Sequence, residues 1–495
     1  MNPLQKFRYK AAKYWKQIAL LSLFAVILFF FPACAPAGGE NQPPKPQEGV
    51  LTYAVLNSLT KTQERSIEIF NKNHPDARIE VLDYSDEGDI ERLMTQLALG
   101  WVPDIMELHR LGSGGDTRPR YYDLGPYVGE KIGGRPVSED EYWLPYRQLV
   151  RKGYLEDLWP YIENDPDLGR EGVLEAPLKA AEIDGGLYML FREVYINTLI
   201  GTESVVGDRD GWTIEELMET FAAMPDGSTI LRYNTTRWDM YSSLFSMTLD
   251  RYIDWETGQC SFDNDEFRSM LAFLVTFPTE FKTALTPVEM REELTWRRLE
   301  GEQMLETVLV SGLLDIADMD AAFGGEQVVF VGYPTEDGSS GSFFNIFGPT
   351  LAMASTCRNK EVAWEFMRSL VSTAYTASKM SDMMYWDCSI LMPINRKSFE
   401  NGITADLHRR RSDTSPTMPT FPGGPKIKTE LPTKENHLQR FEKLLNNTTQ
   451  LCWPDDALSD IVWEAIGPYF AGDKTMDETI QIVQNRVELY VSENR

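Results

Sequence analysis

The amino-acid sequence predicts an α/β protein with a parallel sheet and enough chain for two hydrophobic cores. Between residues 51 and 108, strand-like and helix-like segments alternate, which is the order that a parallel sheet requires. Of the 495 residues, 42% are hydrophobic and 12% are aromatic. Removing the N-terminal segment described below leaves about 450 residues, a length that supports two lobes with separate cores.

The elements of this first region follow from the spacing of its apolar residues. Strands show a two-residue period and helices a 3.6-residue period, and turns rich in Gly, Pro, Asn and Asp separate the segments. The expected elements are a strand at Leu51–Leu56, a helix at Thr62–Asn71, a strand at Arg78–Tyr84, a helix at Ile90–Leu99 and a strand at Ile105–Leu108.

Polar residues follow each of these strands. In open parallel sheets, ligands bind beyond the carboxyl ends of the strands, where the loops from neighbouring strands meet. The loops in question are Asn57–Leu59, Ser85–Glu87 and Glu107–Arg110. The sequence therefore predicts a binding region at this edge of the sheet.

After residue 110, the spacing of apolar residues is less regular, and the predictions depend more on composition and capping residues. Residues 111–146 are rich in Gly, Arg, Pro and Tyr and are predicted to be a loop insertion over one lobe. Thr213, with Glu216 three residues on, predicts a capping box at the start of a helix over Trp212–Ala223. The last hundred residues are expected to be mainly helical after the Pro-, Thr- and Gly-rich stretch Thr414–Pro432.

The N-terminus has the layout of an export signal. Residues 1–17 carry five cations and no acid, and Ile18–Ala33 is almost wholly apolar. A segment of sixteen residues suits the apolar core of a signal peptide, whereas a membrane-spanning helix needs about 20. We therefore expect residues 1–33 to be a signal peptide and the body to lie outside the cell.

Cys34 follows the apolar segment directly and is the expected site of lipidation. Residues 34–49 would then form the lipidated cysteine and a Pro- and Gly-rich tether. Phe31 and Pro32 are unusual for a lipoprotein signal, so an uncleaved N-terminal anchor helix is the alternative. Both interpretations place the protein at the extracellular face of a bacterial cell membrane.

Charge and cysteine content exclude several classes of function. Without the five cations of residues 1–33, 43 basic residues face 75 acidic ones, a net charge of −32. Such a body is repelled by phosphate backbones, so nucleic acid is not an expected partner. Four further cysteines could form two disulfides or stay as buried thiols, and none has the spacing of a zinc site. They are Cys260, Cys357, Cys388 and Cys452.

Motifs of common enzymes are missing from the sequence. It contains no GxSxG, GxxxxGK[ST], GxGxxG or HExxH pattern, and it has four histidines in all. We therefore expect no enzymatic activity, no cofactor and no metal.

Six parts of the body match the motifs of one known family in that family's order. The matching residues are Phe70–Val81, Leu93–Leu108, Asp184–Tyr188, Gly211–Leu217, Phe347–Ala354 with Asn359–Phe366, and Tyr469–Glu478 with Gln484–Val487. Over residues 50–495 the chain thus resembles the extracellular solute-binding proteins of family 1, the group that includes maltose-binding protein. The departures are the 111–146 insertion and Phe191, where many members have Pro. The C-terminal match is similar to members from Gram-positive bacteria.

The resemblance implies a two-lobe, periplasmic-binding-protein-like (type II) α/β fold with hinge crossings and a helical C-terminal region. Lobe one would comprise residues 50–190 and 343–395, and lobe two residues 195–340 and 400–495. Such proteins bind their solute between the lobes, and closure about the hinge creates the shape that a permease recognises.

The layout of the family also implies candidate ligand contacts. A sugar presents C–H faces that stack on aromatic rings and hydroxyls that hydrogen-bond to charged or amide groups. The expected contacts lie after the first and third strands, at the hinge and in two aromatic loops. They are Asn57, Glu107, His109, Arg192, Glu193, Trp238, Trp386 and Asp387.

The function implied is that of a monomeric lipoprotein that captures a carbohydrate, expected to be an oligosaccharide, and delivers it to the permease of an ABC importer. Two alternatives stay open at this point: a surface glycan hydrolase, and a solute-binding protein for a ligand other than a sugar. A surface scaffold or sensor with a vestigial cleft is a third interpretation.

Overall fold

A computed structural model describes residues 48–86, 88–110, 142–166, 168–231, 236–279, 297–371, 391–408, 433–452 and 455–494. Among these residues, no helix combines the length and apolar character needed to cross a membrane. Cys34, Cys388 and Thr414–Pro432 lie outside the described residues.

The N-terminal region forms the predicted parallel strands. β1 (Val50–Val55) pairs in parallel with both β2 (Arg78–Asp83) and β3 (Ile105–Glu107). The helices α2 (Lys61–Asn73) and α3 (Asp89–Ala98) connect these strands. The prediction of alternating strands and helices is therefore confirmed, because periodicity and turn residues agree along this whole stretch.

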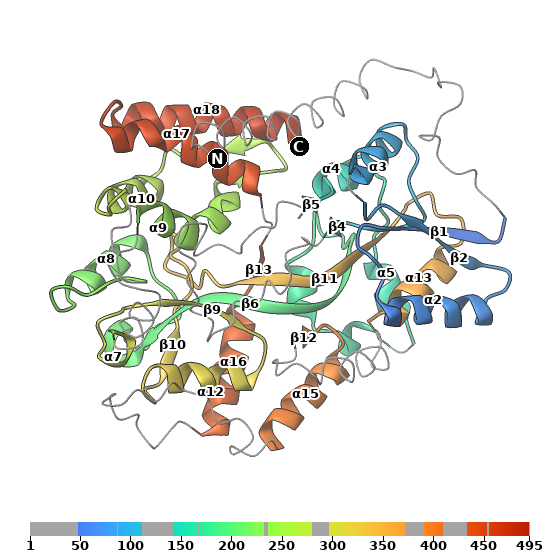
Figure 1. Cartoon of the computed structure of the whole chain (residues 1–495), viewed down its shortest axis with the longest axis horizontal. Helices are drawn as coiled ribbons and strands as arrows, with labels where there is room; N and C mark the ends of the chain where they lie inside the picture. The colour runs from blue at the N-terminus through green and yellow to red at the C-terminus, as the bar shows by residue number, and fades with distance from the viewer. Residues whose placement is uncertain are drawn as a thin grey trace.

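Two long antiparallel strands, β6 (Leu190–Thr202) and β11 (Phe343–Met353), run through the middle of the molecule (Figure 1). β11 also pairs with β3, so the crossing strands and the parallel strands form one mixed sheet, which has nine strands among the described residues. The other strands of this sheet are β9 (Glu306–Val310), β10 (Val328–Phe330) and β12 (Met392–Pro393), which pair with β6, and β13 (Gln450–Leu451), which pairs with β11.

The buried apolar side chains form two clusters, here called the first core and the second core. Both crossing strands contribute to each of them. Val194 of β6 and Phe344 of β11 belong to the first core, whereas Leu199 and Phe343 belong to the second. The chain is thus built as two packed bodies connected by β6 and β11; the predicted residue limits of the two lobes stay a prediction.

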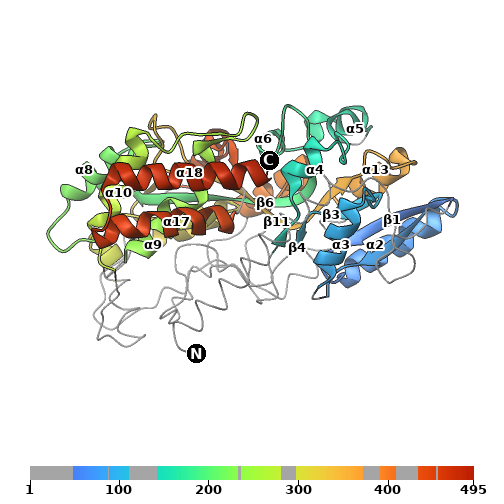
Figure 2. The ribbon, with the colours of Figure 1, turned by 90° about the horizontal axis from the view of Figure 1, so that it is seen from above.

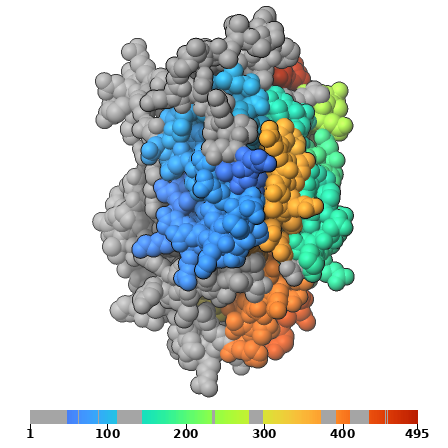
Figure 3. Space-filling model, turned by 90° about the vertical axis from the view of Figure 1, so that its right-hand side faces the viewer, coloured from blue at the N-terminus to red at the C-terminus, as the bar shows by residue number. Residues whose placement is uncertain are grey.

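Helices around the first core come from distant parts of the sequence. Figure 3 shows residues 50–100 (blue) beside α13 (orange) at this end of the molecule. Phe366 of α13 packs edge-on against Tyr53 of β1, with ring centroids 5.5 Å apart. The elements here are β4 (His109–Arg110), β5 (Tyr142–Trp143), α4 (Tyr146–Arg151), α5 (Trp159–Asn164), η1 (Arg170–Gly172), α6 (Glu175–Lys179) and α13 (Lys360–Ser369).

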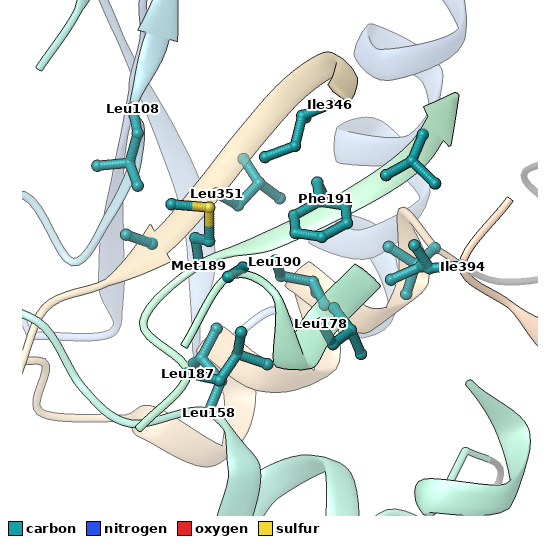
Figure 4. Packing of buried hydrophobic residues seen from close by; sticks show 14 of the residues in the cluster. Leu108, Leu158, Leu178, Leu187, Met189, Leu190, Phe191, Ile346, Leu351 and Ile394 are labelled. Carbon is teal, nitrogen blue, oxygen red and sulfur yellow. The ribbon is translucent and has the colours of Figure 1, made fainter. Parts of the chain in front are cut away.

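Phe191, the unusual residue before the hinge, is buried in this first core with 1% of its surface exposed. Figure 4 shows its ring in the same cluster as Ile346 and Ile394. The ring fills space between β6 and its neighbours, so the departure from Pro is accommodated by apolar packing.

The second core is enclosed mainly by helices. The capping box predicted at α8 (Ile214–Ala222) is present: the Glu216 amide donates to Thr213 Oγ1 at 3.2 Å, and the Thr213 amide donates to Glu216 Oε2 at 2.9 Å. α17 (Asp456–Ala471) and α18 (Met476–Asn494) lie side by side (Figure 2), as expected for a helical C-terminal region. The other elements are α7 (Glu203–Val206), α9 (Arg237–Leu244), η2 (Ser246–Tyr252), β7 (Ile253–Asp254), β8 (Gln259–Cys260) and α10 (Asp265–Val275).

On the side of the crossing strands that faces away from α17 and α18 lie the helices α12 (Leu313–Ala322), α15 (Arg396–His408) and α16 (Lys434–Asn447) (Figure 1). Asp320 of α12 is fully buried and joins two of them, because both Arg440 guanidinium nitrogens of α16 donate to it at 2.8 Å. His437 of α16 lies 3.1 Å from the same carboxylate. The Asp320 carboxylate is thus paired within the protein, which gives it a structural role.

The prediction of a loop over 111–146 is wrong at its C-terminal end. Tyr142–Trp143 forms β5, which pairs with β4, and Leu144 is buried in the first core. Short strands of two residues leave no periodicity in a sequence, which is why this one was not predicted. No disulfide joins any two of Cys260, Cys357 and Cys452.

Candidate ligand-binding site

Glu107, at the end of β3, is a fully buried carboxylate that organises the predicted edge of the sheet. Its Oε2 accepts hydrogen bonds from the amides of Leu56 (2.7 Å) and Asn57 (3.0 Å). The Asn57 side-chain amide donates to the same oxygen at 2.8 Å, and the Tyr53 hydroxyl donates to Oε1 at 3.1 Å. The carboxylate therefore holds the chain where it leaves β1.

The protonation of Glu107 reflects two opposing effects. Burial raises the pKa of this carboxyl group above its ordinary value, while the hydrogen bonds from Asn57, Leu56 and Tyr53 act in the opposite direction. Burial is the larger cause. A carboxylate whose oxygens already accept four hydrogen bonds is better suited to supporting the loop than to binding a solute directly.

Asn57 and His109 join the same network, so the structure brings together three of the predicted residues. Asn57 also donates to the backbone oxygen of His109 at 2.8 Å. His109 is fully buried, and its ring stacks on Trp143 of β5 with centroids 4.2 Å apart. The short β4–β5 pair thus covers the imidazole.

Arg192 and Glu193 lie together on β6, in the middle of the crossing strands. The guanidinium of Arg192 donates to Glu193 Oε2 at 3.0 Å, and both side chains are buried. Next to them, the pairing of β6 with β11 shifts between Phe347 and Thr350, which marks a bulge. The predicted hinge position of this pair is consistent with that irregularity, and its ligand contact stays a prediction.

One face of the crossing strands is polar and aromatic, and we call it the hinge face. Paired residues of antiparallel strands point to the same side of a sheet. The register therefore places six residues on this face: Glu193, Tyr195 and Asn197 of β6, and Phe347, Asn345 and Phe343 of β11. The opposite face carries Val194, Ile196, Phe344 and Ile346, which pack in the first core.

Two amides of the hinge face have atoms without a hydrogen-bond partner in the described part of the chain. These atoms are Asn345 Nδ2 and Asn197 Oδ1, and their side chains are 5% and 8% exposed. The two residues are diagonal neighbours across the strands, a relation that puts side chains about 7 Å apart. A donor and an acceptor buried in this way cost stability unless a bound molecule or water pairs with them.

The Tyr333 hydroxyl is a third such group at the hinge face. It has no partner among the described residues, and its ring stacks on Phe343 with centroids 5.1 Å apart. Burial first, and then the neighbouring Cys452 and Tyr195, raise the pKa of Tyr333. The hydroxyl therefore keeps its proton and can both donate and accept.

Trp238 lies on α9 and is separate from the other candidates. Its half-buried ring meets Trp463 of α17 edge-on, with centroids 4.7 Å apart, and lies 5.8 Å from the ring of Tyr241. This aromatic group packs against the second core. Trp386 and Asp387 lie outside the described residues, so the ligand contacts predicted for them stay predictions.

A small pocket lies elsewhere, beside α16. Its volume is about 50 Å³, and Asp208, Asp210, Arg440 and Lys443 line part of it. Lys443 pairs with Asp210 at 2.5 Å. That volume holds only a few water molecules and is too small for a sugar ring. The described residues contain no group of three His, Cys, Asp or Glu side chains placed to hold a metal.

Sequence reasoning missed Tyr195, Asn197, Tyr333 and Asn345. A signal for two of them was present, because Asn is unfavourable inside strands and both asparagines interrupt apolar, strand-like runs. Their meeting on one face depends on a pairing between segments about 150 residues apart, which a single sequence does not reveal.

Comparison with solved structures assigns the chain to a class by its fold: it has the fold of the two-lobe extracellular solute-binding proteins, and the predicted resemblance is confirmed at that level. A periplasmic oligogalacturonide binding protein from Yersinia enterocolitica matches with a TM-score of 0.53 and 15% identity, covering 90% of this chain and 100% of the other.

Two further structures cover the chain to a similar extent. An extracellular solute-binding protein family 1 structure from Alicyclobacillus acidocaldarius has a TM-score of 0.49 and 12% identity, with 90% and 100% of the two chains covered. The sugar-binding protein MalE from Xanthomonas citri has a TM-score of 0.47 and 13% identity, with 90% and 97% covered. No family model and no curated protein matches the sequence.

Proposed function

We propose that the chain is the solute-binding lipoprotein of an ABC importer, and that it captures a carbohydrate over the hinge face and delivers it to a permease. Cys34 would carry the lipid that holds it at the extracellular face of the bacterial membrane. The protein would act by binding and hinge closure, without catalysis.

The observation that carries this proposal is the set of unpartnered polar atoms at the hinge face. An amide donor, an amide acceptor and a neutral phenol match sugar hydroxyls, which both donate and accept. Phe347 and Tyr195, which are partly exposed, add aromatic rings to the same face, and C–H faces of sugars pack on such rings. A charged solute would favour fixed opposite charges, whereas Arg192 and Glu193 already pair with each other.

The fold supports the same conclusion. The Yersinia enterocolitica protein with the same fold is described as a periplasmic oligogalacturonide binding protein, and this description supports a carbohydrate as the class of solute. The N-terminal signal and Cys34 support delivery to the outside of the cell, where importers collect their solutes.

Binding is tested by calorimetric titration of the detergent-solubilised full chain with panels of mono- and oligosaccharides, peptides, polyamines and organic acids. We expect heat of binding from at least one neutral sugar, with the sugar recovered intact. A response restricted to peptides, polyamines or organic acids would contradict the carbohydrate assignment. Recovery of shortened sugar would favour the hydrolase alternative.

Anchoring is tested by growing bacteria that express the chain with labelled palmitate. We expect label in the wild-type protein and none in Cys34→Ala, with Cys260→Ala as the matched control that keeps its label. An unlabelled wild-type protein that still fractionates with membranes would indicate an uncleaved N-terminal helix.

A further inference from the structure

A group of contacts bridges the two cores away from the crossing strands. On one side of the bridge is α4, whose Leu149 is buried in the first core. On the other side are η2, whose Leu249 is buried in the second core, and the end of α18. Figures 1 and 2 both show α4 beside the C-terminal end of α18.

Arg147 is the centre of this bridge. Its guanidinium donates to Asp250 Oδ2 of η2 at 2.8 Å and lies over the ring of Trp255, 4.8 Å from the centroid. The Trp255 indole N–H donates to the other oxygen of Asp250, and Arg151 donates to the backbone oxygen of Trp255. One arginine thus meets an aspartate and a tryptophan that are already held together.

Gln148 adds a second connection one residue along α4. Its side-chain amide donates to the backbone oxygen of Glu493 at 3.1 Å, and the side chain is 6% exposed. Glu493 lies at the end of α18, whose Val491 is buried in the second core. Contacts from one turn of α4 therefore reach two separate elements of the second core.

The bridge and the hinge face lie on the same side of the crossing strands. Figure 1 shows α12 and α16 on one side of β6 and β11, and α4 and α18 on the other. Phe343 of the hinge face is buried in the second core together with Val487 and Val491 of α18, so the hinge face points toward the side on which α18 lies. Separation of the cores on this side would expose the hinge face and break the bridge.

We propose that the α4 bridge is a latch that stabilises the closed arrangement of the two cores and thereby sets solute affinity. This inference rests on the proposed function. A contact present in the closed state and lost in the open one shifts the balance between them by its own interaction energy. Because Arg147 and Asp250 are 22% and 33% exposed at their side chains, the ion pair is screened by salt.

The test measures opening directly, in the detergent-solubilised full chain without sugar. Dyes are attached to bio-orthogonal residues that replace the exposed Glu91 on α3 and Gln481 on α18, so that the native cysteines are kept. Single-molecule energy transfer then reports the distance between the two cores in Arg147→Ala, Asp250→Ala and the double variant.

We expect each single variant to increase the ratio of open to closed molecules by about two- to tenfold, and sugar affinity to fall by no more than the same factor. The double variant should match the singles, because both remove the same contact. Raising the salt concentration should open the wild type and leave the variants unchanged.

Arg170→Ala is the matched control. Arg170 pairs with Glu163 at 2.7 Å and lies 4.2 Å from the ring centroid of Trp159, so it makes the same kinds of contact within one body. Distance distributions of the bridge variants that coincide with those of wild type and Arg170→Ala would overturn the latch. If no sugar binds the wild type, the proposed function fails, while the distances still decide whether the bridge holds the cores together.

Discussion

The end of β3 and the hinge face both bury polar side chains, but they differ in how those side chains are paired. At β3, the oxygens of Glu107 accept four hydrogen bonds from Tyr53, Leu56 and Asn57. At the hinge face, Asn345 Nδ2, Asn197 Oδ1 and the Tyr333 hydroxyl have no partner among the described residues.

This difference distinguishes polar groups that stabilise the fold from polar groups that can bind a solute. A buried polar group that is fully paired stabilises the fold, whereas one left unpaired costs stability that a bound molecule can restore. The residues that sequence position favours, Asn57 and Glu107, are thus the ones that hold the framework. Under the proposed function, the groups that bind the solute lie on β6, on β11 and at Tyr333.

The largest expected effect is the loss of stability in Glu107→Ala. Removing the carboxylate leaves buried donors at Leu56, Asn57 and Tyr53 unpaired, which should lower the free energy of unfolding by about 3 kcal/mol or more. Urea unfolding of the full chain measures this. Glu107→Gln keeps an acceptor and should lose less than half as much. A fully stable Glu107→Ala protein that no longer binds sugar would instead make Glu107 a ligand contact.

At the hinge face we expect the opposite result, a loss of sugar affinity without a loss of stability. Asn345→Leu removes an unpartnered amide without changing its size greatly, so stability should be unchanged or slightly higher while sugar affinity falls about tenfold or more. Calorimetry and urea unfolding on the same samples give both numbers.

Asn71→Leu provides the matched control for that substitution. Asn71 exchanges two hydrogen bonds with Ile79, at 2.7 and 3.1 Å, and should lose about 1–2 kcal/mol of stability with no change in affinity. If both asparagine variants behave alike, the distinction between paired and unpaired amides does not hold.

A smaller effect is expected in the pH dependence of stability. Burial raises the pKa of Glu107 in the folded protein above its ordinary value of 4.5, so the folded state holds this proton more tightly than the unfolded state does. The contribution of Glu107 is therefore fully present below pH 4.5 and is lost as pH rises through the raised pKa. Urea unfolding at a series of pH values should show that the free energy of unfolding falls more steeply with rising pH in wild type than in Glu107→Gln. Equal slopes of unfolding free energy against pH in the two proteins would contradict a raised pKa of Glu107.

The smallest effect is expected at Trp238. Its ring packs with Trp463 and Tyr241 on the second core, so Trp238→Phe should change sugar affinity less than about twofold. Calorimetry measures this as well. A loss comparable with that of Asn345→Leu would place part of the binding site on α9 and confirm the contact that the sequence predicts.

The sequence was sufficient for the elements whose signals are local. The strands and helices of residues 50–108 form within one or two residues of their predicted ends, and Thr213 caps α8 as expected. β5 was missed because two residues carry no period. The hinge face was missed because it depends on register: Asn345 lies opposite Tyr195 only through pairing of strands far apart in the chain.

A crystal structure of the full chain with a bound neutral sugar tests the central claim most directly. We predict sugar hydroxyls within hydrogen-bond distance of Asn345 Nδ2 and Asn197 Oδ1, with Glu107 still bonded to Leu56 and Asn57. A sugar bound to Glu107 or stacked on Trp238, with the hinge-face amides still unpaired, would contradict it.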